Sequence, residues 1–276
     1  MSIHPFDQAM ALRPDPASSP DLYTGSTSEA YWNMIGPFGG ATAATVLQAV
    51  MRHPARIGDP VALTVNYAAA LEAGEFSVRA IPVRTNRSTQ HWQITLSQKD
   101  AAGLDSVVIT ATALTAVRRQ TWSQNDTPMP EVPPPEDTPA STLFAGVSWV
   151  SRYEIRILRG AVPEVFDGRS SDSLTQLWLR ERPERPLDFL ALTAMADAFY
   201  PRVWLRRAHR VPAGTVTITI YFHAGSAELL ANGCDFLLGQ AQAQAFRNGF
   251  FDQSAQLWSR TGVLLATTQQ LVYFKE

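Results

Sequence analysis

Apolar and polar residues alternate along several segments of the chain. Val61, Leu63 and Val65 alternate with small or polar residues, a spacing typical of a strand with one buried face. Further strand-like segments lie at residues 75–83, 90–98 and 106–117, and a second series lies at 215–223, 239–246, 251–259 and 263–275. Each series predicts an antiparallel sheet.

Helical spacing replaces the alternation once in each half of the chain. Residues 41–51 are rich in alanine, with apolar side chains at helical spacing behind Gly39 and Gly40. Residues 187–199 are predicted to form a second helix that ends at Pro201, because a proline ring clashes with the carbonyl four residues earlier. One more candidate strand precedes each helix, at residues 23–33 and 151–158. Each half is therefore predicted to run strand, helix and four strands.

A proline-rich segment lies between the two series. Six of the 19 prolines fall within residues 120–140, among Ser, Thr, Asp and Glu. Proline fixes φ and donates no backbone N–H, so this segment is predicted to be an extended connector outside any sheet. The sequence therefore predicts an N-terminal half over residues 1–118, a linker over 119–144 and a C-terminal half over 145–276.

Composition and charge restrict the class of protein. Hydrophobic residues make up 45% of the chain and charged residues 17%, which favours a compact globule with a large core. The 23 Lys and Arg against 25 Asp and Glu give a net charge of −2, so no nucleic-acid partner is expected. No run approaches the ~18 apolar residues of a membrane span, and the N-terminus lacks a signal-peptide pattern, so a cytoplasmic location is expected.

Several common motifs are absent. Residues 146–150 lack the second glycine of a serine nucleophile elbow, and residues 36–40 have neither dinucleotide nor P-loop spacing. The single cysteine, Cys234, excludes an internal disulfide, and the five histidines lack metal-ligand spacing. The sequence therefore predicts no metal and no bound cofactor.

Two polar residues stand at positions where apolar side chains are expected. Asp197 lies in the last turn of the second predicted helix, where the helix dipole disfavours an acid, and it shares a face with Leu190 and Ala194. Gln270 shares one side of its predicted strand with Ala266 and Val272. A buried carboxylate or amide needs hydrogen-bond partners, so both are candidate functional residues.

Two further features are less specific. Gly39 and Gly40 offer backbone amides that can hold an oxyanion, but glycine at this place equally permits close packing of a helix on a sheet. In the strand after the second helix, even-numbered residues are predicted to face the helix, whereas Thr215, Thr217 and Thr219 are predicted to face away from it. The pattern alone does not select one of these threonines.

Three motifs, in this order, resemble the double hot-dog acyl-CoA thioesterases of the bacterial thioesterase II type. They are Phe38-Gly39-Gly40 before the alanine-rich helix, the segment from Arg84 to Ser88 before a strand, and the segment from Gly262 to Gln270. The resemblance extends over residues 31–274. It implies an α+β fold of two tandem hot-dog units, each an antiparallel sheet wrapped round a central helix, paired into a double hot-dog. It also implies a homo-oligomer.

The same resemblance implies hydrolysis of acyl-CoA thioesters to a fatty acid and CoA. The family positions the attacking water with an Asp, a Thr and a Gln, which correspond here to Asp197, Thr215 and Gln270. Thr215 is selected because it lies eight residues before His223 of a Phe-His pair, and Gln270 because it follows a Leu-Ala-Thr-Thr run. Asp197 is expected to act as general base, with its pKa raised by burial.

Four more residues are expected to bind the substrate. The backbone amides of Gly39 and Gly40 are expected to polarise the thioester carbonyl. Arg84 and Arg87 are candidate contacts for the phosphates of CoA. An apolar tunnel between helix and sheet is expected to take the acyl chain.

The chain departs from the family pattern in two places. Thr217-Ile218 replace an Asp-His pair, and Asn86 replaces the glycine of a turn. The first change leaves a non-catalytic protein that binds acyl-CoA or another small ligand as an alternative. A hot-dog enoyl-CoA hydratase is a weaker alternative, since that enzyme pairs an Asp with a His five residues later, where this chain has Arg202.

Overall fold

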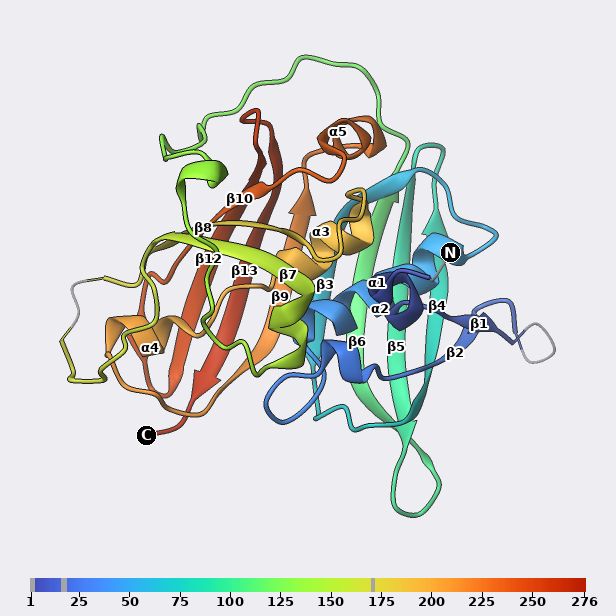
Figure 1. The fold of residues 1–276 in the computed structure, drawn as a ribbon. Coiled ribbons are helices and arrows are strands. Elements are labelled where there is room, and N and C mark those ends of the chain that lie inside the picture. The colour runs from blue at the N-terminus through green and yellow to red at the C-terminus, as the bar shows by residue number, and fades with distance from the viewer. Residues whose placement is uncertain (1–2, 16–18, 170–171) are drawn as a thin grey trace.

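The computed structural model describes residues 3–15, 19–169 and 172–276, and it shows the chain built around one antiparallel sheet (Figure 1). The strands of the N-terminal part are β1 (Arg13–Pro14), β2 (Leu22–Ser26), β3 (Asp59–Tyr67), β4 (Glu75–Thr85), β5 (Thr89–Lys99) and β6 (Asp105–Ala116). Those of the C-terminal part are β7 (Tyr153–Arg159), β8 (Thr175–Glu181), β9 (Ala213–Phe222), β10 (Leu237–Gln242), β11 (Phe246–Arg247), β12 (Phe250–Ser259) and β13 (Leu264–Phe274). The α-helices are α1 (Pro5–Ala9), α2 (Gly39–Arg52), α3 (Phe189–Met195), α4 (Arg202–Arg206) and α5 (Ser226–Asn232).

The sheet is continuous across the two parts of the chain. Its strand order is β1-β2-β4-β5-β6-β3-β9-β13-β12-β10-β8-β7, with β11 paired to β12. β3 and β9 lie side by side at the centre, where Leu63 is opposite Ile220. The hydroxyl groups of Thr64 and Thr219 form a hydrogen bond of 3.0 Å across the same pair of strands. Outward from this pair, each part continues in the same order, from its last strand back to its first.

α2 and α3 lie next to each other against one face of the sheet (Figure 1). α2 is rich in alanine, and Ala43, Ala44 and Leu47 have no exposed surface. The start of α2 meets the end of α3 so closely that a Cβ on Gly40 would lie 2.4 Å from the carbonyl oxygen of Ala194. This contact places the turn that follows α3 beside the first amides of α2.

Most of the predicted elements are present, but the second helix is not as predicted. α3 ends at Met195, so Asp197 lies in a turn beyond the helix and not in its last turn. Two strands, β7 and β8, precede α3, whereas one was predicted. α2 begins at Gly39, as its sequence predicted. The helical spacing at 187–199 continues past the true end because Ala196, Ala198 and Phe199 are also buried.

The proline-rich segment covers part of the outer face of the sheet. Residues 117–134 contain no helix or strand and run from β6 towards the C-terminal part (Figure 1). Met129 and Val132 pack against a cluster that contains Trp178 and Trp258, and Nε1 of Trp178 donates to the carbonyl oxygen of Pro133 at 2.9 Å. α2 and α3 lie against the opposite face of the sheet. No helix in the described residues is long and apolar enough to cross a membrane.

Candidate active site

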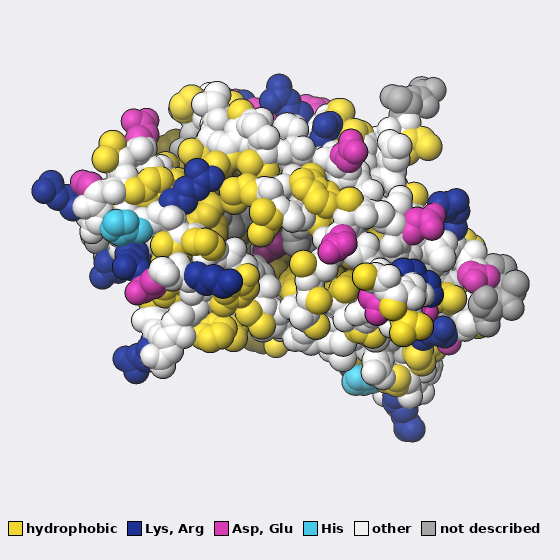
Figure 2. Space-filling view, turned by 90° about the horizontal axis from the view of Figure 1, so that it is seen from below, with side chains coloured by type: hydrophobic (Ala, Val, Ile, Leu, Met, Phe, Trp, Pro, Cys, Tyr) yellow, Lys and Arg dark blue, Asp and Glu magenta, His cyan; other side chains and the backbone are white. Residues whose placement is uncertain are grey.

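A cavity of about 500 Å³ opens between the two parts of the chain. Its walls come from the loop before α2, the end of β3, residues 144–150, the turn after α3, and strands β9, β12 and β13. Its volume is within the usual range for a small-molecule pocket. The hollow at the centre of Figure 2 is surrounded by hydrophobic side chains, with Lys and Arg side chains along one side. Within the described residues, Asp197 is the one charged side chain that lines the cavity.

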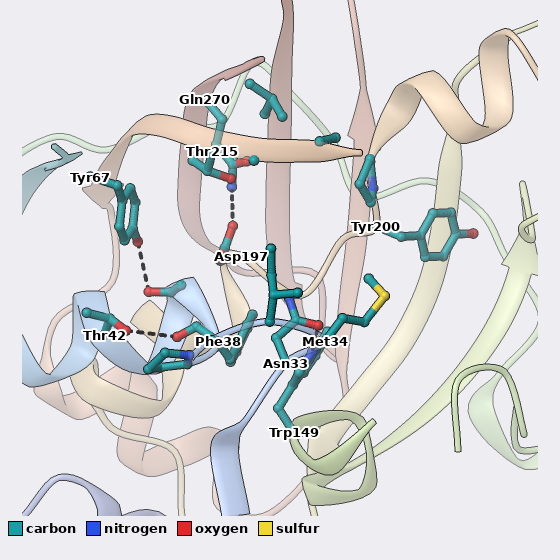
Figure 3. A pocket seen from close by; sticks show the side chains of 18 of the residues that line it. Asn33, Met34, Phe38, Thr42, Tyr67, Trp149, Asp197, Tyr200, Thr215 and Gln270 are labelled. Carbon is teal, nitrogen blue, oxygen red and sulfur yellow. Dashed lines mark hydrogen bonds between the residues drawn. The ribbon is translucent and has the colours of Figure 1, made fainter. Parts of the chain in front are cut away.

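Asp197 is held by groups from α2 and β13 (Figure 3). Its Oδ1 accepts a hydrogen bond of 2.7 Å from Nε2 of Gln270, and its carboxylate also accepts from the backbone N–H of Gly40. Burial raises the pKa of Asp197 from an ordinary 3.8 to about 7, against the lowering effect of these two hydrogen bonds. The carboxyl can therefore exchange a proton near neutral pH.

Gly39 makes room for this carboxylate. A Cβ at position 39 would lie 2.7 Å from Oδ2 of Asp197, which is closer than two such atoms approach. The carbonyl oxygen of Gly39 accepts a hydrogen bond of 2.8 Å from the hydroxyl of Tyr67, at the end of β3. Gly39 lines the cavity, whereas Gly40 packs against α3 and donates its amide to Asp197.

A β-bulge brings Thr215 to the same cavity. The pairing of β9 with β13 shifts between Leu271 and Val272, which leaves Val216 as an extra residue in β9. The extra residue reverses the alternation of faces, so Thr215 lines the cavity with Gln270 (Figure 3). The prediction that Thr215 faces away from the helix side is therefore wrong, because strict alternation does not hold through a bulge.

Arg202 supports the segment that follows Asp197. Its guanidinium is fully buried and donates to the carbonyl oxygens of Tyr200 and Ser173 at 3.0 and 3.1 Å, and to the hydroxyl of Thr175 at 2.6 Å. Burial lowers the pKa of Arg202 to about 10. Arg202, which stands where a hot-dog enoyl-CoA hydratase has a histidine, therefore connects the segment after Asp197 to the start of β8.

The structure does not bring Arg84 or Arg87 to the cavity. Both side chains are exposed beside the β4–β5 hairpin, where Nε of Arg84 donates to Oδ1 of Asn86 at 3.0 Å. This hairpin lies at the end of the sheet where β3 begins. The cavity lies where β3 ends, and a strand of 9 residues spans about 25 Å.

Arg210 lies at the mouth of the cavity instead. Its guanidinium donates to Sδ of Met34 at 3.4 Å and lies 5.8 and 5.4 Å from the ring centroids of Phe144 and Trp204. All three contacts line the cavity. Arg210 forms no ion pair within the described residues, whereas the nearby Arg207 pairs with Glu276.

Four further groups lie at the cavity that were not predicted as site residues from the sequence. The rings of Phe38 and Trp149 stack at 4.1 Å and 7°, which joins the loop before α2 to the 3-10 helix Ser148–Arg152. Tyr67 and Gln253 also line the cavity. Both occupy inward-facing positions in their strands, so the alternation that identified Gln270 contained the signal for them.

Together these groups can bind and activate a water molecule. Asp197 supplies a carboxyl that titrates near pH 7, Gln270 an amide and Thr215 a hydroxyl, all facing one cavity. The described part of the chain holds no group of three or more His, Cys, Asp or Glu side chains that could bind a metal ion. The arrangement therefore provides acid–base chemistry on a bound substrate.

Two family models match the chain. One, described as the acyl-CoA thioesterase C-terminal domain, matches residues 127–274. The other, described as the acyl-CoA thioesterase N-terminal domain, matches residues 28–116. Between them the two matches include every element that lines the cavity.

Solved structures have the same fold over nearly the whole length. The chain is similar to a conserved protein of unknown function with a hot-dog fold from Alicyclobacillus acidocaldarius, with 46% identity, a TM-score of 0.91, and coverage of 100% of this chain and 99% of that chain. It is also similar to acyl-CoA thioesterase II TesB2 from Mycobacterium marinum, with 18% identity, a TM-score of 0.76, and coverage of 98% of each chain. A search of curated proteins found no match. The fold described above is therefore a hot-dog fold.

Proposed function

Because the chain belongs to the acyl-CoA thioesterase family, we propose that it hydrolyses acyl-CoA thioesters in the cavity that Asp197, Thr215 and Gln270 line. We also propose that residues 1–118 and 145–276 are two hot-dog units, joined by the linker 119–144 and paired into a double hot-dog. The hydrogen bond of 2.7 Å between Gln270 and Asp197 carries the proposal. It holds a carboxyl with a pKa near neutrality where a substrate can reach it.

We assign Asp197 as the general base. A water molecule held by Asp197, Gln270 and Thr215 gives a proton to the carboxylate as its oxygen attacks the thioester carbonyl carbon. The tetrahedral intermediate then collapses, the C–S bond breaks, and the sulfur takes the proton back from Asp197. The products are a carboxylic acid and CoA. Since a thioester is already activated, no covalent nucleophile is needed.

We assign polarisation of the thioester carbonyl to the backbone N–H of Gly39. Gly39 is the first residue of α2, a helix of 14 residues whose dipole favours negative charge at this end. The amide of Gly40 already donates to Asp197. We also assign an uncharged acyl group to the substrate, because within the described residues no Lys or Arg lines the cavity to pair with a carboxylate on the acyl chain.

The test is release of free thiol from acyl-CoAs with uncharged acyl groups of graded length. We expect hydrolysis by the wild-type chain, and we expect Thr215→Val to lower kcat/KM about 10- to 100-fold through loss of one hydrogen bond to the water. Thr217→Val is the matched control, because Thr217 is opposite the half-exposed Leu271 on the other face of the sheet. We expect it to leave kcat/KM unchanged.

Two results would count against this proposal. Equal losses of kcat/KM in the Thr215→Val and Thr217→Val variants would mean that Thr215 has no specific role in binding the water. Binding of acyl-CoA without release of thiol would instead favour the non-catalytic binding protein.

We propose that Arg210 contacts a phosphate group of CoA, since it is a cation at the mouth of the cavity with no ion pair within the described residues. We expect Arg210→Gln to raise KM for acyl-CoA about tenfold and to leave KM unchanged for the matching acyl-N-acetylcysteamine thioester, which has no phosphate. Arg207→Gln is the control, because Arg207 is paired with Glu276. A similar rise in KM for both thioesters would assign Arg210 to another part of the substrate.

A further inference from the structure

Gln253 is a buried polar side chain that the proposed reaction does not use. It lies on β12 directly opposite Gln270 of β13, and it lines the same cavity. Only 2% of its surface is exposed. Its Nε2 atom has no hydrogen-bond partner within the described residues. Gln253 thus differs from Gln270, whose Nε2 is bound to Asp197.

An unpaired amide at this position destabilises the fold. A buried donor without a partner loses its hydrogen bond to water and gains none in return. Phe251 and Ala255, the next inward-facing residues of β12, carry no acceptor in their side chains, and neither does Val272, which also lines the cavity. The cavity that Gln253 lines can supply the missing acceptor through a small movement of the amide. Water can supply it between turnovers, and a substrate oxygen can replace that water.

We infer that Gln253 is a substrate-binding residue whose amide donates a hydrogen bond to a carbonyl or hydroxyl oxygen of the acyl-CoA close to the reacting carbon; this inference rests on the proposed function. Opposite residues of antiparallel strands have Cα atoms about 5 Å apart. Gln270 is hydrogen-bonded to Asp197, the proposed base, so the carbon under attack lies near Gln270. Because Gln253 is opposite Gln270, a substrate oxygen within its reach is a few bonds from that carbon. Two substrate oxygens fit: that of the thioester carbonyl, and one on C3 of a 3-hydroxyacyl or 3-oxoacyl group.

The test compares Gln253→Leu with Gln269→Leu on octanoyl-CoA and on 3-hydroxyoctanoyl-CoA. We expect Gln253→Leu to lower kcat/KM for the 3-hydroxyacyl substrate at least about tenfold. We expect the same variant to unfold at a urea concentration no lower than that of the wild type, because leucine needs no hydrogen-bond partner. A merely structural glutamine would lose stability and activity together. Gln269, the exposed neighbour of Gln270, is the control and should change neither quantity.

The pattern of losses distinguishes the two oxygens. A similar loss on both substrates identifies the thioester carbonyl as the acceptor. A loss confined to 3-hydroxyoctanoyl-CoA identifies the C3 oxygen and assigns oxygenated acyl groups as the substrate class. Unchanged kinetics on both substrates would overturn the inference.

A binding measurement separates this inference from the proposed function. If the wild type hydrolyses neither these two substrates nor the acyl-CoAs of graded length, the proposed function is wrong. Calorimetry with a 2-oxoalkyl-CoA thioether, which keeps the carbonyl and cannot be hydrolysed, then decides the role of Gln253. Weaker binding by Gln253→Leu would then support the inference. Equal binding by the variant, or no binding by the wild type, would overturn it.

Discussion

Asp197→Asn is expected to lower kcat/KM for acyl-CoA hydrolysis by about 10²- to 10⁴-fold, because an amide cannot take a proton from the attacking water. Asparagine keeps the shape of aspartate, and its Oδ1 can still accept the hydrogen bond from Gln270. Thiol release under steady-state conditions measures the loss. Asp105→Asn, at a side chain that is 65% exposed, is the control and should leave kcat/KM unchanged.

The same carboxyl sets the expected pH dependence. Because the pKa of Asp197 is about 7, kcat/KM of the wild type should fall about tenfold for each pH unit below neutrality, as the base becomes protonated. The residual activity of Asp197→Asn should lack this decrease. A decrease in the wild type with its midpoint near pH 4 would show that the base is a carboxyl with an ordinary pKa.

Stability should change in the opposite direction to activity. The pKa of Asp197 rises from 3.8 to about 7 on folding, so its contribution to stability is complete below pH 3.8 and is lost as the pH rises through 7. Asparagine does not ionise, so Asp197→Asn should not lose stability as the pH rises through 7. At pH 8 the variant should unfold at a higher urea concentration than the wild type, and at pH 4 the two should unfold together. A lower midpoint at pH 8 would mean that the ionised carboxylate stabilises the fold.

The part of the site that follows from local pattern could be predicted from the sequence. Burial of one face of a sheet imposes alternation, so a polar residue at an inward position stands out. Gln270 was identified in this way, and Asp197 by the corresponding helical spacing, and the structure joins the two by a hydrogen bond. Gln253 obeys the same rule, since Phe251 and Ala255 on either side of it are buried.

The remaining features depend on contacts between distant segments. The bulge at Val216 is defined by the pairing of β9 with β13, and no local signal in β9 marks it. Whether an arginine lies near the cavity depends on which end of the sheet its loop joins. Arg84 lies at the end far from the cavity, whereas Arg210 lies at the mouth of the cavity. Topology decides both outcomes, and composition and spacing contain little information about it.

Gly40→Ala is expected to destabilise the fold. The new Cβ would lie 2.4 Å from the carbonyl oxygen of Ala194 and 2.6 Å from the ring of Phe38. A ring can rotate, but a backbone carbonyl moves only with its helix, so α2 and α3 must separate. Overpacking of this kind costs about 1–3 kcal/mol, and separation of the helices also withdraws the Gly40 amide from Asp197. Urea denaturation should show the loss, together with loss of hydrolysis.

Gly39→Ala tests the space that the Asp197 carboxylate needs, whereas Gly40→Ala tests the space that the packing of α2 on α3 needs. Its Cβ would contact Oδ2 of Asp197 at 2.7 Å, and that atom belongs to a side chain that can rotate away. We therefore expect Gly39→Ala to keep most of the stability that Gly40→Ala loses, while kcat/KM falls because Asp197 is displaced from Gln270. Gly146→Ala, with no atom within 4 Å of the new Cβ, should match the wild type in both measurements. Equal destabilisation by the two neighbouring substitutions would mean that Asp197 is too tightly held to move, and that the start of α2 and the carboxylate form one rigid unit.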